Sequence, residues 1–174
     1  MATGLTARLL LTVVVVVLIG NYAGNSFAAD GAKAKALELS KALGKAKLFA
    51  GLTDKERDAL KSAAMLRHCK AGERLIEQGK SLGRMFIVLE GQVSVRVNGK
   101  LVATLPEQSL VGEVEFLDML PASADVVILK ETHLIELNNA ALTGLMQNQP
   151  RLGYVLMREI AKIEGQRLRV MDLK

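Results

Sequence analysis

Few side chains in this sequence could carry out catalysis or hold a metal ion. The chain has two histidines, His68 and His133, and a single cysteine, Cys69. A metal-dependent enzyme built on a β-barrel needs two or three histidines and a carboxylate from neighbouring strands. The two histidines are 65 positions apart, and neither belongs to a closely spaced pair. We therefore interpret both as packed or surface residues.

Nucleophilic and nucleotide-dependent catalysis also lack their usual motifs. The sequence contains no nucleophile-elbow glycines around a serine, no P-loop and no Rossmann fingerprint. Cys69 ends a strand-like run that begins at Met65, which predicts a buried thiol; the alternative is an intermolecular disulfide. We predict that the protein is not an enzyme and uses no metal or other cofactor.

Length and composition predict one globular domain. The chain has 174 residues and 18.8 kDa, and 50% of its residues are hydrophobic, which excludes a disordered chain. The 23 basic and 18 acidic residues are interspersed, and the net charge is +5. This pattern does not indicate a nucleic-acid-binding surface.

The first 28 residues predict a secretory signal. Arg8 precedes an apolar block from Leu9 to Gly20, and small or polar residues follow as far as Ala28. We expect cleavage after Ala28 and a periplasmic or secreted protein. The alternative is an uncleaved N-terminal membrane anchor, which would be the only membrane contact.

Short helices and then short strands are expected after this segment. Residues 29–47 are rich in Ala and Lys and predict a helical lead-in, while Thr53 and Glu56 form a capping box at the start of a second helix. Asn98-Gly99 predicts a two-residue hairpin turn. The expected strands cover residues 65–69, 73–77, 85–90, 92–97, 101–105, 124–129 and 132–137.

The C-terminal region predicts one helix over residues 139–147 and a longer one from Pro150 to about Met171. On the longer helix, apolar residues recur at helical spacing. They are Leu152, Leu156, Ile160, Ile163 and Val170. We expect this stripe to form a homodimer seam, with packing inside the monomer as the alternative.

From Leu48 to about Met171 the sequence resembles the cyclic nucleotide-binding domain family, the β-roll shared by the catabolite activator protein, kinase regulatory subunits and gated channels. Four stretches in the expected order carry the resemblance: residues 48–52 followed by Glu56-Arg57, residues 72–79, residues 84–93, and Gly112-Glu113 ahead of a short apolar turn. The resemblance implies an α+β, mainly β fold: an antiparallel β-roll or jelly-roll barrel with short N-terminal helices and a long C-terminal helix. The roll with its flanking helix would occupy residues 48–138, and the C-terminal helices residues 139–174.

In this family a cassette of the form F-G-E-L-A-L-x-x-x-x-P-R-A-A-T-V holds the ligand, and the resemblance places it at residues 111–126. Gly112 and Glu113 match the glycine and the ribose-binding glutamate, and Pro121 anchors the second half. The candidate binding residues are those that fall on the motif, namely Gly112, Glu113, Val114, Ala122, Ser123 and Asp125.

Three positions depart from the cassette pattern. Ala122 stands at the position of the phosphate-binding arginine, Asp125 at that of a hydroxyl residue, and Glu115 where a small residue is usual. A buried phosphate requires a cationic partner, so we expect a negative pocket that does not bind cyclic AMP or cyclic GMP in the usual way. Arg84, Arg96 and Lys130 are the bases that could substitute, and we expect them to be solvated.

These expectations combine into an exported, non-catalytic binding, sensing or assembly module, acting on a protein partner or as a homodimer. The alternatives are a periplasmic receptor for a cyclic nucleotide or related small ligand and, least favoured, a cupin-like metal enzyme. Transcription factors with this roll continue into a helix-turn-helix module, and no such module follows here before Lys174. Nucleic acid is therefore not an expected partner.

Overall fold

The computed structural model describes residues 31–172. The predicted signal or anchor over residues 1–28 lies outside these residues. Of the described residues, 31–38 belong to a first unit and 39–172 to a second unit. Residues 31–45 are helical. Within the described residues, no helix combines the length and apolarity needed to cross a bilayer.

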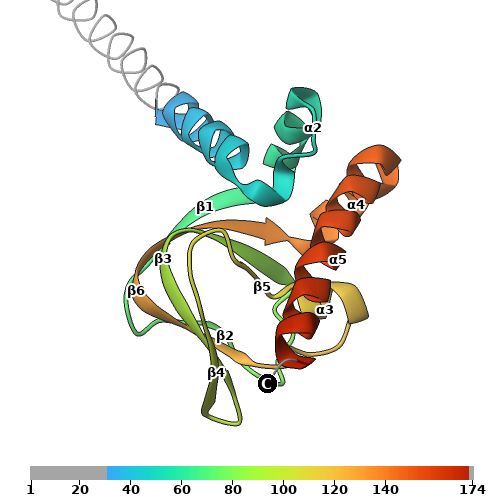
Figure 1. Ribbon diagram of the computed structural model, residues 1–174. Coiled ribbons are helices and arrows are strands. Elements are labelled where there is room, and N and C mark those ends of the chain that lie inside the picture. Colours follow the sequence, from blue (N-terminus) through green and yellow to red (C-terminus); the bar gives the residue numbers. More distant parts are fainter. Residues whose placement is uncertain (1–30, 173–174) are drawn as a thin grey trace, which may run out of the picture. The chain divides into compact units, whose positions relative to one another are not determined.

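The second unit is an antiparallel β-roll flanked by helices (Figure 1). Its elements are η1 (Lys47–Phe49), α2 (Asp54–Ala59), η2 (Leu60–Ser62), β1 (Ala64–Cys69), β2 (Arg74–Ile76), β3 (Arg84–Val97), β4 (Lys100–Leu105), β5 (Leu110–Val111), α3 (Glu113–Asp118), β6 (Asp125–Asn138), α4 (Asn139–Asn148) and α5 (Pro150–Asp172). The strands follow the order β1-β6-β3-β4, while β2 pairs with β6 and β5 pairs with β3. The α+β fold class is therefore confirmed.

Two local sequence signals are confirmed in detail. The Thr53 side chain accepts from the backbone N–H of Glu56, and the Glu56 carboxylate accepts from the backbone N–H of Thr53 at 2.8 Å. Asn98 and Gly99 have φ angles of 51° and 77°, and the flanking residues Val97 and Lys100 pair across the hairpin. Both signals are short-range, so the surrounding fold has little influence on them.

The prediction of separate strands on either side of Gly91 and of residues 130–131 was wrong. Residues 84–97 form the single strand β3, and residues 125–138 form the single strand β6. Their register shifts between Val88 and Val93, next to Gly91. Gly91 has φ +105°, and a Cβ there would lie 2.6 Å from the carbonyl oxygen of Glu131. The glycine therefore marks a bulge within a continuous strand, where the two backbones approach closely.

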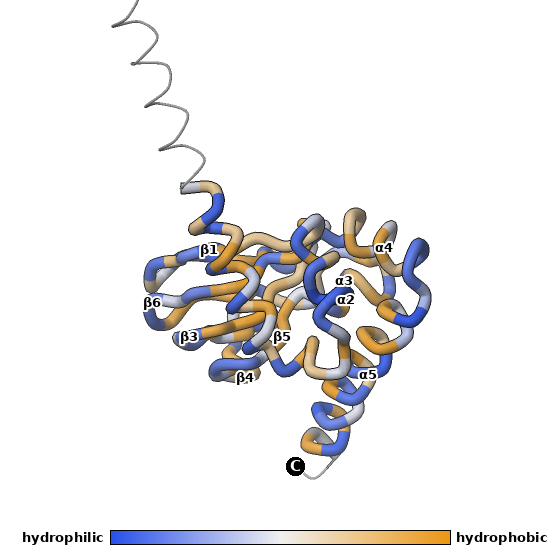
Figure 2. Tube along the Cα trace, turned by 90° about the horizontal axis from the view of Figure 1, so that it is seen from above, coloured by the Kyte–Doolittle hydropathy of each residue, from blue (hydrophilic) through white to orange (hydrophobic). Residues whose placement is uncertain are grey.

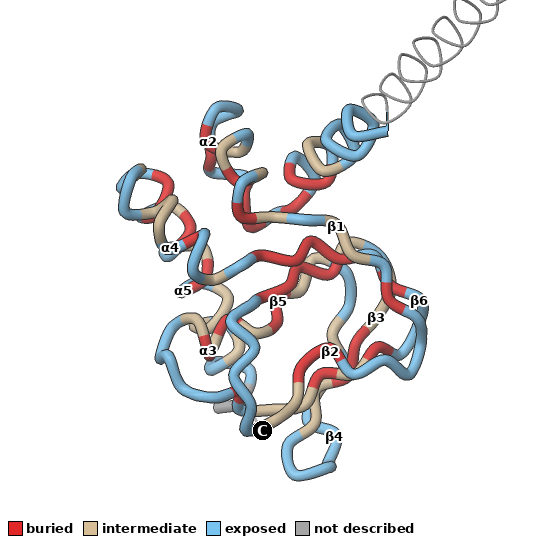
Figure 3. The backbone as a smooth tube through the Cα atoms, turned by 180° about the vertical axis from the view of Figure 1, so that it is seen from behind, coloured by how far each residue is buried: buried red, intermediate tan, exposed pale blue. Residues whose placement is uncertain are grey.

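Buried residues are concentrated along the long strands β3 and β6 (Figure 3). Their side chains form two hydrophobic clusters, one on each face of these strands. Alternate residues of β3 divide between them, because successive side chains of a strand point to opposite faces. Met85 and Ile87 join the helices in the first cluster, whereas Phe86 and Val88 belong to the second cluster, inside the roll.

The long helix α5 packs on its own chain. Leu152, Leu156 and Ile160, three residues of the expected dimer seam, are at most 1% exposed and belong to the first cluster. The alternative of packing inside the monomer is therefore correct for this part of the stripe. Val170, further along the helix, is 58% exposed.

Candidate functional site

The cassette begins where β5 ends and the short helix α3 starts. Gly112 is the N-cap of α3, with φ 83° in the left-handed region. A Cβ at this position would lie 2.8 Å from the carbonyl oxygen of Arg84 and 3.1 Å from the side chain of Ile76. Both the backbone conformation and the close approach therefore require glycine here.

Glu113, the first residue of α3, is buried and paired with the C-terminal helix. It is 4% exposed, and its Oε1 forms an ion pair with Arg167 of α5. Arg167 also donates to the carbonyl oxygen of Leu110 at 2.5 Å and lies 2.8 Å from a carboxylate oxygen of Glu164. The second carboxylate oxygen of Glu113, Oε2, is buried and has no hydrogen-bond partner among the described residues. One guanidinium thus joins α5 to both β5 and α3.

Burial and the ion pair with Arg167 shift the pKa of Glu113 in opposite directions. Removal from water raises the pKa of this carboxyl above its usual value, and the positive charge of Arg167 opposes part of that rise. The arginine is therefore the partner that makes a carboxylate tolerable at this buried position.

The sequence analysis did not identify Arg167 as a site residue. It is 54 positions from Glu113 in the sequence, and it does not belong to the apolar stripe of the C-terminal helix. No local motif contains the pair, so only the packing of α5 against α3 reveals it (Figure 1).

The second half of the cassette presents no cation. Ala122 is 8% exposed, and its methyl group belongs to the cluster inside the roll. Its backbone N–H donates to the carbonyl oxygen of Lys80 at 3.0 Å, and its carbonyl oxygen accepts from the N–H of Gly79 at 2.8 Å. Ser123 is exposed, and Val114, in the first turn of α3, is half-buried.

Asp125 and Glu115, the two acidic residues that depart from the cassette pattern, accept hydrogen bonds from backbone N–H groups. The carboxylate of Asp125 accepts from the N–H of Gln78 at 3.0 Å. Glu115 is 9% exposed and accepts from the N–H groups of Leu82 and Gly83 at 3.1 and 2.8 Å. These hydrogen bonds stabilise both charges, so the acids hold the loops around the cassette in addition to lowering its potential.

The bases considered as substitutes for the phosphate arginine contact other groups. Arg84 pairs with Glu136, which also pairs with Arg67. Arg96 donates to the carbonyl oxygen of Gly99, and Lys130 is exposed. Two other bases contact the cassette. Arg167 of α5 pairs with Glu113, and Arg74 of β2 lies 4.0 Å from a carboxylate oxygen of Asp125.

The histidines form a cross-strand pair on β1 and β6. The rings of His68 and His133 stack with centroids 4.7 Å apart, and His68 Nε2 lies 2.6 Å from a carboxylate oxygen of Glu131. Over residues 31–172, no group of three or more His, Cys, Asp or Glu side chains could hold a metal ion. Cys69 is 1% exposed, as the sequence predicts, and burial raises the pKa of its thiol.

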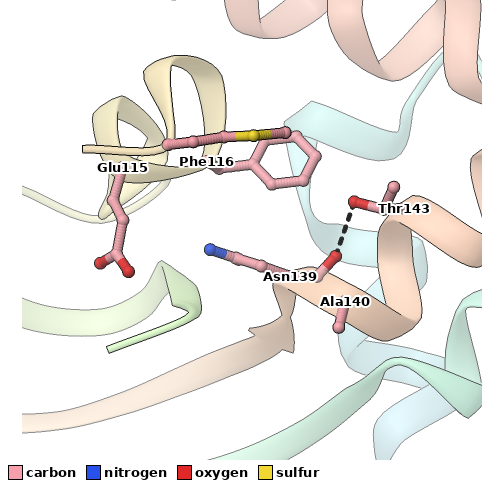
Figure 4. A pocket seen from close by; sticks show the side chains of 6 residues that line it. Glu115, Phe116, Asn139, Ala140 and Thr143 are labelled. Atoms are coloured by element: carbon pink, nitrogen blue, oxygen red, sulfur yellow. Dashed lines mark hydrogen bonds between the residues drawn. The ribbon is translucent and has the colours of Figure 1, made fainter. Parts of the chain in front are cut away.

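A shallow cavity of about 240 Å³ lies between α3 and α4. Figure 4 shows Glu115 and Phe116 of α3 facing Asn139, Ala140 and Thr143 of α4 across it. The side-chain oxygen of Asn139 is buried and has no partner among the described residues. None of the six candidate binding residues lines this cavity, although Glu115 of the cassette does.

Comparison with known proteins agrees with the fold. Residues 66–149 match the family model described as "Cyclic nucleotide-binding domain". The chain is 30% identical over 122 residues to the Pycsar effector protein XpPycTIR of Xanthomonas perforans, covering 65% of this chain and 40% of the effector. It is 24% identical over 131 residues to a cGMP-dependent protein kinase of Toxoplasma gondii, covering 75% of this chain and 13% of the kinase. The chain thus spans less than half the length of these two relatives.

Among solved structures, the fold is similar to a cyclic nucleotide-binding domain from Methylobacillus flagellatus KT. The TM-score is 0.66 at 24% identity, over 77% of this chain and 78% of that one. The antiparallel roll with the glycine-capped α3 is therefore the fold of a cyclic nucleotide-binding domain. The chain is therefore similar to the cyclic nucleotide-binding domain family in sequence over residues 66–149 and in its fold. Such domains are typically non-catalytic sensors, although some relatives are parts of enzymes.

Proposed function

We propose that this chain is an exported, non-catalytic module that does not bind cyclic AMP or cyclic GMP in the manner usual for its family. The observation that carries the proposal is the buried methyl group of Ala122 at the position where the family motif has its phosphate-binding arginine. The two arginines that contact the cassette are already paired with its acids, Arg167 with Glu113 and Arg74 with Asp125.

The magnitude of the missing interaction supports this proposal. A buried charge left without its partner costs about 3 to 5 kcal/mol, which weakens binding by roughly 10² to 10³·⁵-fold. Asp125 adds a negative charge in the same half of the cassette. Micromolar affinity for a cyclic phosphate is therefore not expected.

In this proposal the module acts through protein contacts, in an assembly or as a homodimer through α5. Residues 1–28 would direct it to the periplasm or the exterior, or would keep it at the membrane. The cassette region then remains as a structural part of the roll, closed by the Arg167 contact.

A second candidate function is a receptor for a different small ligand. It is favoured by Oε2 of Glu113, which has no partner among the described residues, because a hydrogen-bond donor on a ligand would stabilise this buried carboxylate oxygen. Such a ligand would be neutral, cationic or phosphorylated differently, and it would offer a hydroxyl or amine group to Glu113. A small molecule found by native mass spectrometry on protein from its own host would support this candidate, and bare protein would contradict it.

Titration calorimetry with cyclic AMP and cyclic GMP tests the main proposal. We expect no binding heat for the unaltered protein up to millimolar nucleotide. The double variant Ala122→Arg with Asp125→Thr restores the cation and keeps an oxygen acceptor for Gln78, so it should gain measurable affinity. Ser123→Arg is the matched control, because it adds the same charge at the adjacent exposed position and should gain none.

Micromolar binding by the unaltered protein would contradict the proposal. So would a double variant that folds, as judged by circular dichroism, and gains no more affinity than Ser123→Arg. In that case Ala122 would not occupy the phosphate position.

A further inference from the structure

The positive charge of the chain is concentrated in one short segment. Residues 31–47 contain five lysines and one glutamate, which gives them a net charge of +4. Residues 48–174 contain 17 basic and 16 acidic residues, a net charge of +1. The interspersed charge pattern therefore describes the roll and its C-terminal helices, but not residues 31–47, which we call the lysine segment.

The lysines of this segment are exposed and unpaired. They are Lys33, Lys35, Lys41, Lys45 and Lys47. All five are exposed, and among residues 31–172 none of them forms an ion pair. The arginines of the roll differ, since Arg67 and Arg84 share Glu136.

The part of the segment that belongs to the second unit is fixed by its apolar side. Ala42, Leu43 and Ala46 are 8%, 1% and 2% exposed and join the first hydrophobic cluster. The lysines at positions 41, 45 and 47, interleaved with these residues, remain exposed. Packing therefore buries the apolar side chains of the segment, while its lysine side chains remain exposed to solvent.

The composition of the segment fits a lipid surface better than a nucleic acid. It contains no arginine and no aromatic residue, whereas nucleic-acid sites use arginine forks and stacking side chains. Attraction to anionic headgroups requires only a high density of positive charge near the surface. The apolar block from Leu9 to Gly20, which predicts an encounter with a membrane, also lies close by in the sequence.

From these observations we infer that the lysine segment binds a membrane surface rich in anionic lipid headgroups. The inference does not depend on whether the cassette binds a ligand. It requires only exposed lysines that are close together in the sequence, so it holds whether the first 28 residues are cleaved or retained.

Vesicle co-sedimentation of the full protein tests this inference. The vesicles contain phosphatidylglycerol and phosphatidylcholine, with pure phosphatidylcholine as the neutral reference. Each lysine near an anionic surface contributes about fivefold to the partition coefficient, so Lys41→Gln should weaken binding by about fivefold. Changing all five lysines of the segment to Gln should weaken binding to anionic vesicles by more than about a hundredfold. Added salt should weaken the binding of the unaltered protein to the same vesicles.

A variant with five other lysines changed to Gln is the matched control. These exposed residues of the roll and its flanking helix are Lys55, Lys70, Lys80, Lys100 and Lys130. The control removes the same total charge and should retain most of the binding. Binding is expressed as the ratio of the partition coefficients for anionic and neutral vesicles, so that insertion of the apolar block from Leu9 to Gly20 contributes to both. Equal losses of this ratio in both variants would overturn the inference. Binding to a DNA duplex but not to anionic vesicles would also overturn it and would indicate a nucleic-acid partner.

Discussion

At the scale of single residues, the central feature is the contact between Glu113 and Arg167. A carboxylate that is 4% exposed is held by one guanidinium from α5, and its other oxygen has no partner among the described residues. Because an unpaired buried charge is costly, the two residues depend on each other. The cassette and the C-terminal helix are therefore coupled through a single side chain.

Removal of Arg167 should measurably destabilise the protein. Arg167→Gln leaves Glu113 buried without its cation, which should lower the free energy of unfolding in urea by about 2 kcal/mol. The side chain of Arg167 is 31% exposed, and solvent screening keeps the loss below that of a fully buried pair.

Two further variants test the cause of this loss. Arg169→Gln, on an exposed position of the same helix, should change stability by less than about 0.5 kcal/mol. Glu113→Gln combined with Arg167→Gln should be more stable than Arg167→Gln alone, because no buried charge remains. If Arg167→Gln and Arg169→Gln behave alike, the ion pair does not stabilise the folded protein.

Short-range sequence patterns predicted local structure correctly, whereas contacts between residues far apart in the sequence were not predicted. Thr53 with Glu56 and Asn98 with Gly99 act within four residues, so the sequence alone identified both. The candidate cassette positions came from the family resemblance, and the roles assigned to them remain predictions. Arg167 was missed because its partner is 54 positions away.

At the scale of elements, the two long strands show what pattern analysis cannot decide. Gly91 interrupts the apolar alternation and therefore suggests a turn, but here it allows β3 to bulge against Glu131 and continue. A bulge and a turn can both require one residue with a positive φ angle, and glycine adopts such an angle easily because it has no side chain. Only the partner strand distinguishes them.

The helix α5 offers a face for the predicted homodimer that differs from the expected stripe. Tyr154, Met157 and Leu168 are 66%, 37% and 61% exposed. Met157 and Leu168 follow Tyr154 by three and fourteen residues, which places all three on nearly the same side of a helix. Figure 2 shows hydrophobic and hydrophilic residues alternating along this helix. The homodimer remains a prediction, but its contact would use this exposed face.

Sedimentation velocity tests that face. The unaltered protein should sediment as a dimer at tens of micromolar, and Met157→Glu with Leu168→Glu should sediment as a monomer, since two charges would be buried in the seam. Leu101→Glu with Val102→Glu is the matched control on β4, where both residues are 58% exposed. A monomeric unaltered protein, or dissociation of the control as well, would contradict the prediction.

At the scale of the whole molecule, one ion pair ties the beginning of the domain to its end. Glu56 of α2 pairs with Arg151 of α5, 95 positions away in the sequence. The side chain of Arg151, followed by the backbone N–H of Thr53, lowers the pKa of Glu56 from 4.5 to about 2. The folded state therefore holds this proton less tightly than the unfolded state does.

This difference predicts a specific loss of stability in acid. The contribution of Glu56 is fully present above pH 4.5 and is lost as the pH falls from there towards 2, because the unfolded chain takes up the proton first. Glu56→Gln should have a lower melting temperature at pH 7 and a smaller decrease between pH 5 and 2. Asp58→Asn, which alters a side chain that is 69% exposed, should keep the decrease of the unaltered protein. Identical pH profiles for all three proteins would contradict this account.

Glu115 has a mechanical consequence beyond its charge. Its carboxylate accepts hydrogen bonds from the backbone N–H groups of Leu82 and Gly83. The carbonyl oxygen of Gly83 in turn accepts from the backbone N–H of Asn139, where α4 begins. These bonds make a short linkage from α3 through one peptide loop to α4. We therefore expect a partner that tilts α3 to displace the first turn of α4 as well, along a route that is additional to the contact between Glu113 and Arg167.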